Sequence, residues 1–167
     1  MKNKHIRPIP HYTGEEQWLY CEKHQITKFR AVRNKRCKSG FNFYCRECKY
    51  HADRQLEEKR SEQRKKVIVE YLGGKCMLCD YDRCYPALDC HHMFAKDKDF
   101  NISSEMRKKG AMSTIRSEVD KCALVCKNCH AEIHQKTYDK IEDLLQTWEA
   151  SKKLRRPEVW DEYLSTV

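Results

Sequence analysis

Cysteines and histidines at metal-ligand spacing constrain this chain more than any other feature. The stretch 126–134 reads C-K-N-C-H-A-E-I-H, and its two histidines, His130 and His134, lie four residues apart. Histidines at that spacing share one face of a helix. A second C-x2-C pair lies at 76–79. We expect these pairs to close one tetrahedral zinc site and to leave the histidines for another metal. The expected zinc ligands are Cys76, Cys79, Cys126 and Cys129.

The composition favours metal-stabilised modules over a large apolar core. Of the 167 residues, 40% are hydrophobic and 35% charged, and eleven are cysteines. Domains with so little apolar material commonly depend on metal ions. Residues 1–10 read MKNKHIRPIP and lack the apolar run of a secretory signal. We therefore expect zinc thiolates rather than disulfides, in the reducing environment of the cytoplasm.

The charge balance indicates a polyanionic partner. The net charge is +9 and the isoelectric point is about 9.0. Nucleic acid is the usual partner of a small basic protein, and a basic surface without a partner is the alternative. No stretch approaches the length of a membrane span, so no membrane association is expected.

A zinc ribbon is predicted at 18–50, after a flexible tail at 1–17. Twenty residues separate a C-x2-H pair from a C-x2-C pair, and strands are expected at 26–32 and 41–44. The predicted ligands are Cys21, His24, Cys45 and Cys48. Cys37 is a spare thiol that replaces His24 if the histidine is not a ligand.

The segment between the C-x2-H pair and the C-x2-C pair of the ribbon, which we call its two knuckles, is basic and contains no acidic residue. Its cations are Lys28, Arg30, Arg33, Lys35, Arg36 and Lys38. Such a segment predicts contacts to nucleic-acid phosphates, and a solvated run of charge is the alternative. Lys108 and Lys109 form a second basic pair with the same expected role.

A charged linker helix is predicted at 51–72. No Pro or Gly interrupts 46–72, and Gly73 and Gly74 end the run. Its middle, 54–66, is almost wholly polar, which is typical of an exposed helix that bridges two modules.

The module at 73–136 predicts two strands and a helix, with a long loop between the strands. The strands are expected near 86–92 and 121–125, and the helix at 126–136. Apolar residues at helical spacing in 112–119 indicate a short helix within the loop.

A helical extension is predicted at 137–167. Apolar residues recur at i, i+3, i+4 and i+7 from Ile141 to Trp148, and Pro157 can begin a last short helix. These helices are expected to pack on the preceding module, and a homodimer contact is the alternative.

The histidines outside the knuckles predict a second kind of metal site. His91 and His92 are adjacent on a predicted strand, so their side chains point to opposite sides. One of them can join His130 and His134 as a third ligand, which leaves open positions on the metal. The other is a histidine suited to taking a proton from water. Metal and base together fit hydrolysis of a phosphodiester. A second structural zinc site is the alternative.

Two motifs resemble the HNH endonucleases. They are L-D-C-H-H at 88–92 and K-C-A-L-V-C-K-N-C-H-A-E-I-H at 121–134. The likeness is greatest to the phage and bacterial subgroup with a four-cysteine zinc site, and the ribbon and charged helix are similar to the front half of some phage-type members. The resemblance implies a small α+β protein with a ββα-metal core, found in the cytoplasm of a bacterium or of a phage-infected host cell.

The resemblance also implies roles for individual residues. His91, His130 and His134 match the ligands of a catalytic ion, and His92 matches the general base. The family's Asn, which helps to orient that base, is replaced here by Lys121. Asn101 or Asn128 would be the compensating residue.

The expected activity is metal-dependent cleavage of double-stranded DNA, with two structural Zn²⁺ sites. The catalytic ion is expected to be Mg²⁺ or Mn²⁺, although imidazole ligands also suit Zn²⁺ or Ni²⁺. The alternatives are a non-catalytic zinc-dependent DNA-binding protein, favoured by Lys121, and a protein that binds or cuts RNA.

Overall fold

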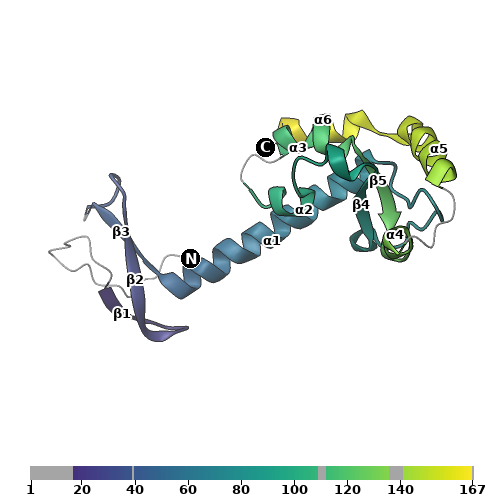
Figure 1. Ribbon diagram of the computed structural model, residues 1–167. Coiled ribbons are helices and arrows are strands. Elements are labelled where there is room, and N and C mark those ends of the chain that lie inside the picture. Colours follow the sequence, from purple (N-terminus) through teal and green to yellow (C-terminus); the bar gives the residue numbers. More distant parts are fainter. Residues whose placement is uncertain (1–16, 39, 109–111, 136–140, 167) are drawn as a thin grey trace. The chain divides into compact units, whose positions relative to one another are not determined.

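The structure is a computed structural model that describes residues 17–38, 40–108, 112–135 and 141–166 (Figure 1). The chain is an α+β protein that divides into two compact units, Met1–Glu58 and Lys59–Val167. Helix α1 (Arg46–Tyr71) contains the boundary between them. Most of the predicted tail and the predicted phosphate contact Lys109 lie outside the described residues.

The first unit contains a three-stranded antiparallel sheet in the order β1-β2-β3. Its strands are β1 (Gln17–Cys21), β2 (Gln25–Arg33) and β3 (Phe41–Cys45). β2 and β3 confirm the two predicted strands, each slightly longer than expected. The prediction missed β1, because a five-residue strand next to a knuckle leaves little alternating pattern to read.

One face of this sheet forms a small core. Phe29 is almost fully buried between Cys21 and Cys45, and Leu19 and Phe43 pack around them. Three buried residues are a very small core, so this unit needs further stabilisation.

Helix α1 ends where the sequence predicts. Gly73 (φ 102°) and Gly74 (φ 78°) adopt left-handed backbone, and the Gly74 N–H donates to the carbonyl of Val69 at 2.9 Å. The expectation of a wholly exposed middle is wrong at Arg64, which is buried. Its guanidinium donates to the carbonyls of Met106 and Lys108, so an arginine that looks like surface charge instead ties the helix to the second unit's loop.

The second unit contains a β-hairpin followed by a helix. β4 (Leu88–His92) pairs antiparallel with β5 (Cys122–Cys126), and α4 (Lys127–His134) follows directly. The predicted order of strand, loop, strand and helix is therefore observed. The loop holds α2 (Ile102–Glu105) and α3 (Met112–Val119), with short 3-10 turns at Tyr85–Ala87 and Ala95–Asp97.

The C-terminal helices complete the core of the second unit. They are α5 (Ile141–Ser151) and α6 (Pro157–Thr166), joined by a 3-10 turn at Lys152–Leu154. Trp160 is fully buried, its indole N–H donates to the carbonyl of Met112 at 3.2 Å, and its ring packs edge-on against Tyr71. Packing on the preceding module is therefore confirmed. Among the described residues, no helix combines the length and apolarity required to cross a membrane.

Candidate metal centres

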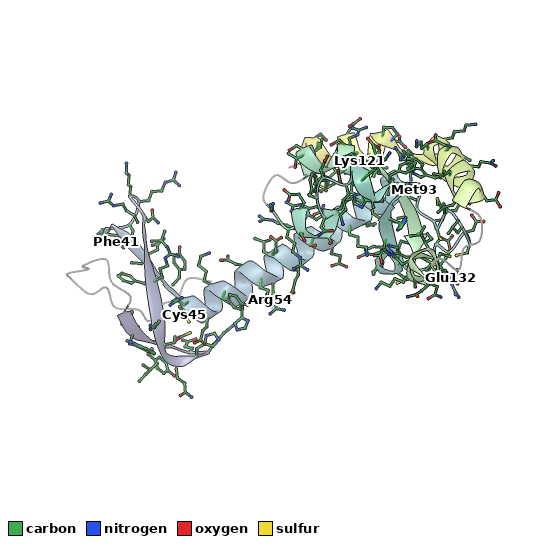
Figure 2. All side chains as sticks on the ribbon, viewed as in Figure 1. Phe41, Cys45, Arg54, Met93, Lys121 and Glu132 are labelled. Carbon is green, nitrogen blue, oxygen red and sulfur yellow. The ribbon has the colours of Figure 1, made fainter. Side chains whose placement is uncertain are left out.

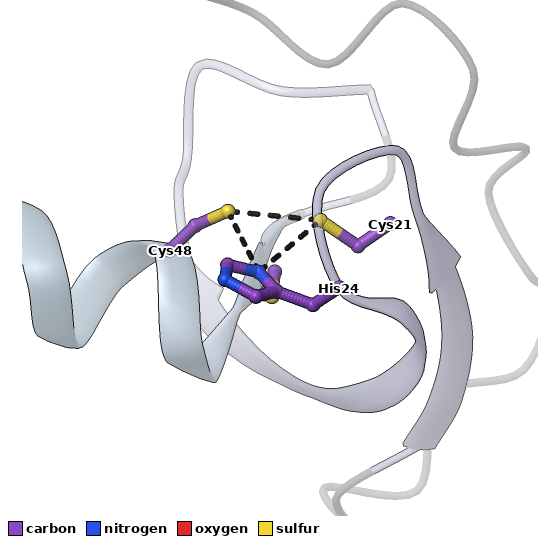
Figure 3. A group of neighbouring side chains, drawn as sticks. Cys21, His24 and Cys48 are labelled. Atoms are coloured by element: carbon purple, nitrogen blue, oxygen red, sulfur yellow. Dashed lines mark hydrogen bonds between the residues drawn. The ribbon is translucent and has the colours of Figure 1, made fainter.

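The two ribbon knuckles bring together a four-ligand cluster with tetrahedral dimensions. Its members are Cys21, His24, Cys45 and Cys48, whose ligand atoms all lie within 4.8 Å of one another. The Nδ1 atom of His24 lies 3.7, 3.5 and 3.4 Å from the three sulfurs in that order, and the Sγ atoms of Cys21 and Cys48 are 3.6 Å apart. Figure 3 shows the side chains of Cys21, His24 and Cys48 turned toward one another. Zinc–sulfur bonds of about 2.3 Å in a tetrahedron place sulfurs about 3.8 Å apart, so the cluster fits zinc.

His24 rather than Cys37 belongs to this cluster. The turn after β1 bends His24 inward, with its backbone N–H donating to the Cys21 carbonyl at 3.2 Å. The outer nitrogen, Nε2, lies 3.8 Å from a carboxylate oxygen of Glu47. A carboxylate behind a metal-binding imidazole orients the ring. Cys37 lies in the β2–β3 turn, outside the cluster.

The chemistry of the thiols also fits a cation at this position. Burial, together with the adjacent thiols of Cys21 and Cys45, raises the pKa of Cys48 to about 12. Burial acts against ionisation of Cys21 too, but the backbone N–H groups of Lys23 and His24 outweigh it and lower that pKa to about 7. A bound cation is what allows closely packed thiols to be ionised together.

The second unit contains a four-cysteine cluster at the start of α4. Its members are Cys76, Cys79, Cys126 and Cys129, again within 4.8 Å of one another. The Sγ atoms of Cys79 and Cys126 are 3.7 Å apart. The knuckle bends at Asp80 (φ 57°), and the Met77 N–H donates to the Leu124 carbonyl at 2.9 Å. The cluster thus joins the knuckle to β5 and α4, and it too can hold zinc.

A third cluster consists of the imidazoles of His91, His130 and His134. His91 projects from β4 toward α4, and its ring centroid lies 5.1 and 5.2 Å from those of His130 and His134. The two helix histidines bring their Nε2 atoms to 3.1 Å, a ligand-to-ligand spacing that suits a shared ion. Burial lowers the pKa of His91 to about 4, with a smaller contribution from the neighbouring histidines. The ring is therefore neutral, the form that binds metal.

A carboxylate stands behind this cluster as well. Oδ2 of Asp89 lies 3.8 Å from Nδ1 of His130, while its other oxygen accepts from Lys65 at 3.2 Å. Such a partner fixes the ring orientation of a metal ligand.

His92 is not a member of the three-histidine cluster and contacts Glu118 instead. Its Nε2 lies 2.8 Å from Oε1 of Glu118, a carboxylate on α3 that is fully buried. The same oxygen accepts the backbone N–H groups of Asp99 and Phe100 at 2.9 and 3.4 Å. The alternation of side chains along β4 thus separates one metal-ligand histidine from one histidine held by a carboxylate.

Lys121 completes this network (labelled in Figure 2). Its Nζ donates to Oε2 of Glu118 at 2.7 Å, to Asp99 at 2.6 Å and to the carbonyl of Asp97 at 2.9 Å. Burial opposes ionisation of Glu118, but Lys121, His92 and the two backbone donors outweigh it and lower the pKa of Glu118 to about 2. The pKa of Lys121 is raised by Asp99 and Glu118. Residue 121, where the resemblance would place an Asn, therefore carries a charged side chain that is bonded to the loop beside His92.

Sequence reasoning missed Glu118. The detectable signal was an acidic residue on the apolar face of a predicted helix, next to Ile115 and Val119. Neither Asn101, whose carbonyl accepts the first bonds of α2, nor the exposed Asn128 on α4 takes this place. Cys84 is exposed and lies outside the three clusters.

The predicted phosphate contacts lie in two places. Lys28 and Arg30 are on β2, Arg33 ends it, and Lys35, Arg36 and Lys38 lie in the turn to β3. Lys108 follows α2, and its ammonium pairs with Glu105 at 2.5 Å. The first group therefore gathers on the ribbon, as the sequence predicts.

Comparisons of the chain with family models, with curated proteins and with solved structures find no match.

Proposed function

We propose that this chain is a metal-dependent endonuclease of the HNH type that hydrolyses DNA phosphodiester bonds. One observation carries the proposal: consecutive residues of β4 present a histidine to a metal cluster and a histidine to a buried carboxylate. His91 turns toward His130 and His134, whereas His92 turns toward Glu118. The antiparallel hairpin followed by α4 supports a ββα-metal core.

The three imidazoles would hold the catalytic divalent ion, Mg²⁺ or Mn²⁺, and by ligand type they also suit Zn²⁺ or Ni²⁺. When bound, that ion supplies a Lewis acid for the phosphate and the leaving oxygen. Three protein ligands leave open positions, whereas the two four-ligand clusters are closed and fit structural Zn²⁺.

His92 is the general base that takes a proton from the attacking water. Because ionised Glu118 can only accept a hydrogen bond, Nε2 of His92 carries the proton and donates a hydrogen bond to the carboxylate, while Nδ1 keeps the lone pair. The carboxylate also stabilises the imidazolium that forms as the proton arrives. Glu118 is therefore a positioning residue that sets the tautomer and orientation of the base.

Lys121 performs the role of the family's Asn by another chemistry. Its ammonium joins Glu118 to Asp99 and to the Asp97 carbonyl, so the loop at 97–100 is attached to the residue that holds His92. Double-stranded DNA is the proposed substrate, and the basic turn of the ribbon supplies phosphate contacts.

Cleavage of supercoiled plasmid by zinc-loaded protein, with Mg²⁺ or Mn²⁺ added, tests the proposal. The parent should nick or cut the plasmid, and His92→Ala should lose at least about 100-fold in rate. His51→Ala is the matched control, since that histidine lies on α1 outside the three-histidine cluster, and it should cut like the parent. Binding without cleavage in any metal would instead favour the non-catalytic DNA-binding protein.

A further inference from the structure

The outer face of the ribbon sheet carries a cluster of exposed apolar side chains. Cross-strand partners share a face, so the register places Trp18 beside Lys28, Tyr20 beside Ile26, and Tyr44 beside Arg30. Their neighbours in sequence, such as Phe29 and Cys45, point to the opposite, buried face. We call this set, with Val32 and Asn42, the outer face.

The apolar members of the outer face are unusually open to solvent. Trp18 is 64% exposed, Tyr20 66%, Ile26 71% and Tyr44 41%. With Val32 they make up five of the ten large hydrophobic side chains that are exposed in the described part of the chain. Exposed apolar side chains gathered on one small sheet mark an interaction surface.

The positive charge of the outer face indicates which kind of ligand it can bind. Lys28 and Arg30 stand among the aromatic rings, and no acidic residue occupies any of its paired positions. The Lys28 ammonium lies 5.6 Å from the ring centroid of Trp18, and the Asn42 amide donates to the Tyr44 hydroxyl at 3.2 Å. The basic β2–β3 turn continues from the same strand. Aromatic rings interleaved with cations suit a ligand that is both planar and anionic.

We propose that the outer face binds an unpaired DNA strand, with Trp18, Tyr20 and Tyr44 stacking on bases and Lys28 and Arg30 pairing with phosphates. Bases in a duplex are stacked on one another and cannot offer their faces, whereas those of a single strand can. The choice of DNA over RNA rests on the proposed function. The assignment of an unpaired strand to the outer face rests only on its aromatic and basic residues.

Titration of the zinc-loaded full chain with a single-stranded thymidine oligonucleotide, without Mg²⁺ or Mn²⁺, tests this assignment. Of the three tryptophans, Trp148 and Trp160 are buried at 8% and 0% exposure, so quenching of the emission reports Trp18. We expect quenching by the oligonucleotide and none by a duplex of the same length. Equal quenching or equal affinity for the duplex would overturn the proposal.

Variants separate stacking from charge, with binding followed by the anisotropy of a labelled oligonucleotide. Trp18→Ala and Tyr20→Ala should each weaken binding roughly tenfold and leave its salt dependence unchanged. Arg30→Gln should lower the slope of log affinity against log salt by about 0.7. Tyr50→Ala, an equally exposed tyrosine on α1, is the matched control and should bind like the parent. Aromatic variants that bind like the parent would overturn the proposal.

Two further outcomes distinguish other occupants. Tighter binding of a uridine oligonucleotide than of the DNA strand would reassign the face to RNA. A dimer seen by sedimentation that dissociates in Trp18→Ala, without oligonucleotide binding, would reassign it to a second copy of the chain. Because no cleavage is measured, a chain that fails to cut DNA can still pass this test, and one that cuts can fail it.

Discussion

The imidazole of His92 and the carboxylate of Glu118 form a 2.8 Å pair in which the carboxylate is fully buried. The two lie 26 positions apart in the sequence. Glu118 receives three further donors, from Lys121 and from the backbone of Asp99 and Phe100. A buried carboxylate with so many donors is ionised and fixed in place, so it can hold His92 in one tautomer.

Replacement of the carboxylate tests its role as a positioning residue. Glu118→Gln should reduce kcat for plasmid cleavage by roughly 10- to 100-fold with little change in KM, because the Glu118 carboxylate is fully buried and has no surface to offer to DNA. Glu118→Asp should recover part of the loss. Glu149→Gln, at a surface glutamate, is the control. Thermal unfolding and zinc content must match the parent, and a Glu118→Gln variant that is folded and fully active would contradict the role.

Lys121 should hold the loop beside the proposed base. In Lys121→Met the bonds to Asp97 and Asp99 are lost, so the amides of Asp99 and Phe100 should exchange with solvent faster than in the parent. Hydrogen exchange read by mass spectrometry of peptides covering 95–101 measures this. Lys96→Met removes a cation from the same loop and serves as the control. Unchanged exchange in Lys121→Met would show that the loop is held by other contacts.

The three clusters should differ in metal content. We expect two tightly held zinc ions per chain and one exchangeable ion, measured by elemental analysis after dialysis. Cys129→Ser should lose one zinc, whereas Cys84→Ser, at an exposed cysteine outside the clusters, should lose none. His134→Ala should keep both zinc ions and lose the exchangeable Mn²⁺. A parent chain with a single zinc would contradict the assignment of both four-ligand clusters.

Zinc removal should unfold much of the protein. Within the described residues, the hydrophobic core of the ribbon contains three buried side chains, and the four-cysteine cluster joins the C-x2-C pair at 76–79 to the start of α4. Since binding energy at such sites is folding energy, a strong chelator should abolish the cooperative thermal transition seen by circular dichroism. Added zinc should restore it. A chelated chain that keeps its parent melting curve would show that the hydrophobic cores suffice.

Tyr71 predicts a dependence of stability on alkaline pH. Burial raises its pKa above the usual value of 10, and its hydroxyl donates to Asp120, which disfavours the phenolate further. Because the folded pKa is raised, this contribution to stability is complete below about pH 10 and is lost as the pH rises above it. The parent should exceed Tyr71→Phe by about 1 kcal/mol in the free energy of unfolding at pH 8.

That difference should shrink in denaturant titrations between pH 10 and 11.5. Both chains are compared at equal zinc content, so changes common to them cancel. A gap that stays constant to pH 11.5 would contradict the assigned direction of the shift.

Several local features of the fold could be predicted from sequence because their causes are local. The C-x2-C and C-x2-H spacings identified the members of both four-ligand clusters, and the i, i+4 spacing identified His130 and His134 of the third, because each pair is brought together by neighbouring backbone. His91 was assigned to the third cluster only through the family resemblance. The end of α1 followed from Gly73 and Gly74, which adopt left-handed backbone at little cost. The order from β4 to α4 followed from apolar periodicity, whereas the α+β class was implied by the family resemblance.

Other features depended on contacts between distant segments. From the sequence, Arg64 is expected to be an exposed charge. In the structure its guanidinium donates to the carbonyls of Met106 and Lys108, more than forty positions away. The outer face of the ribbon required the strand register, because alternation alone does not show which aromatic residues lie side by side.

The sequence by itself determined which residues can bind metal and that His91 and His92 point to opposite sides of one strand. Only the tertiary structure decided what lies opposite His92. Glu118 of α3 is buried beside His92 of β4, and a buried carboxylate persists only where several donors from separate segments meet it. Hydrogen-bond donors from distant segments come together only in the folded chain, so they produce no periodic pattern in the sequence.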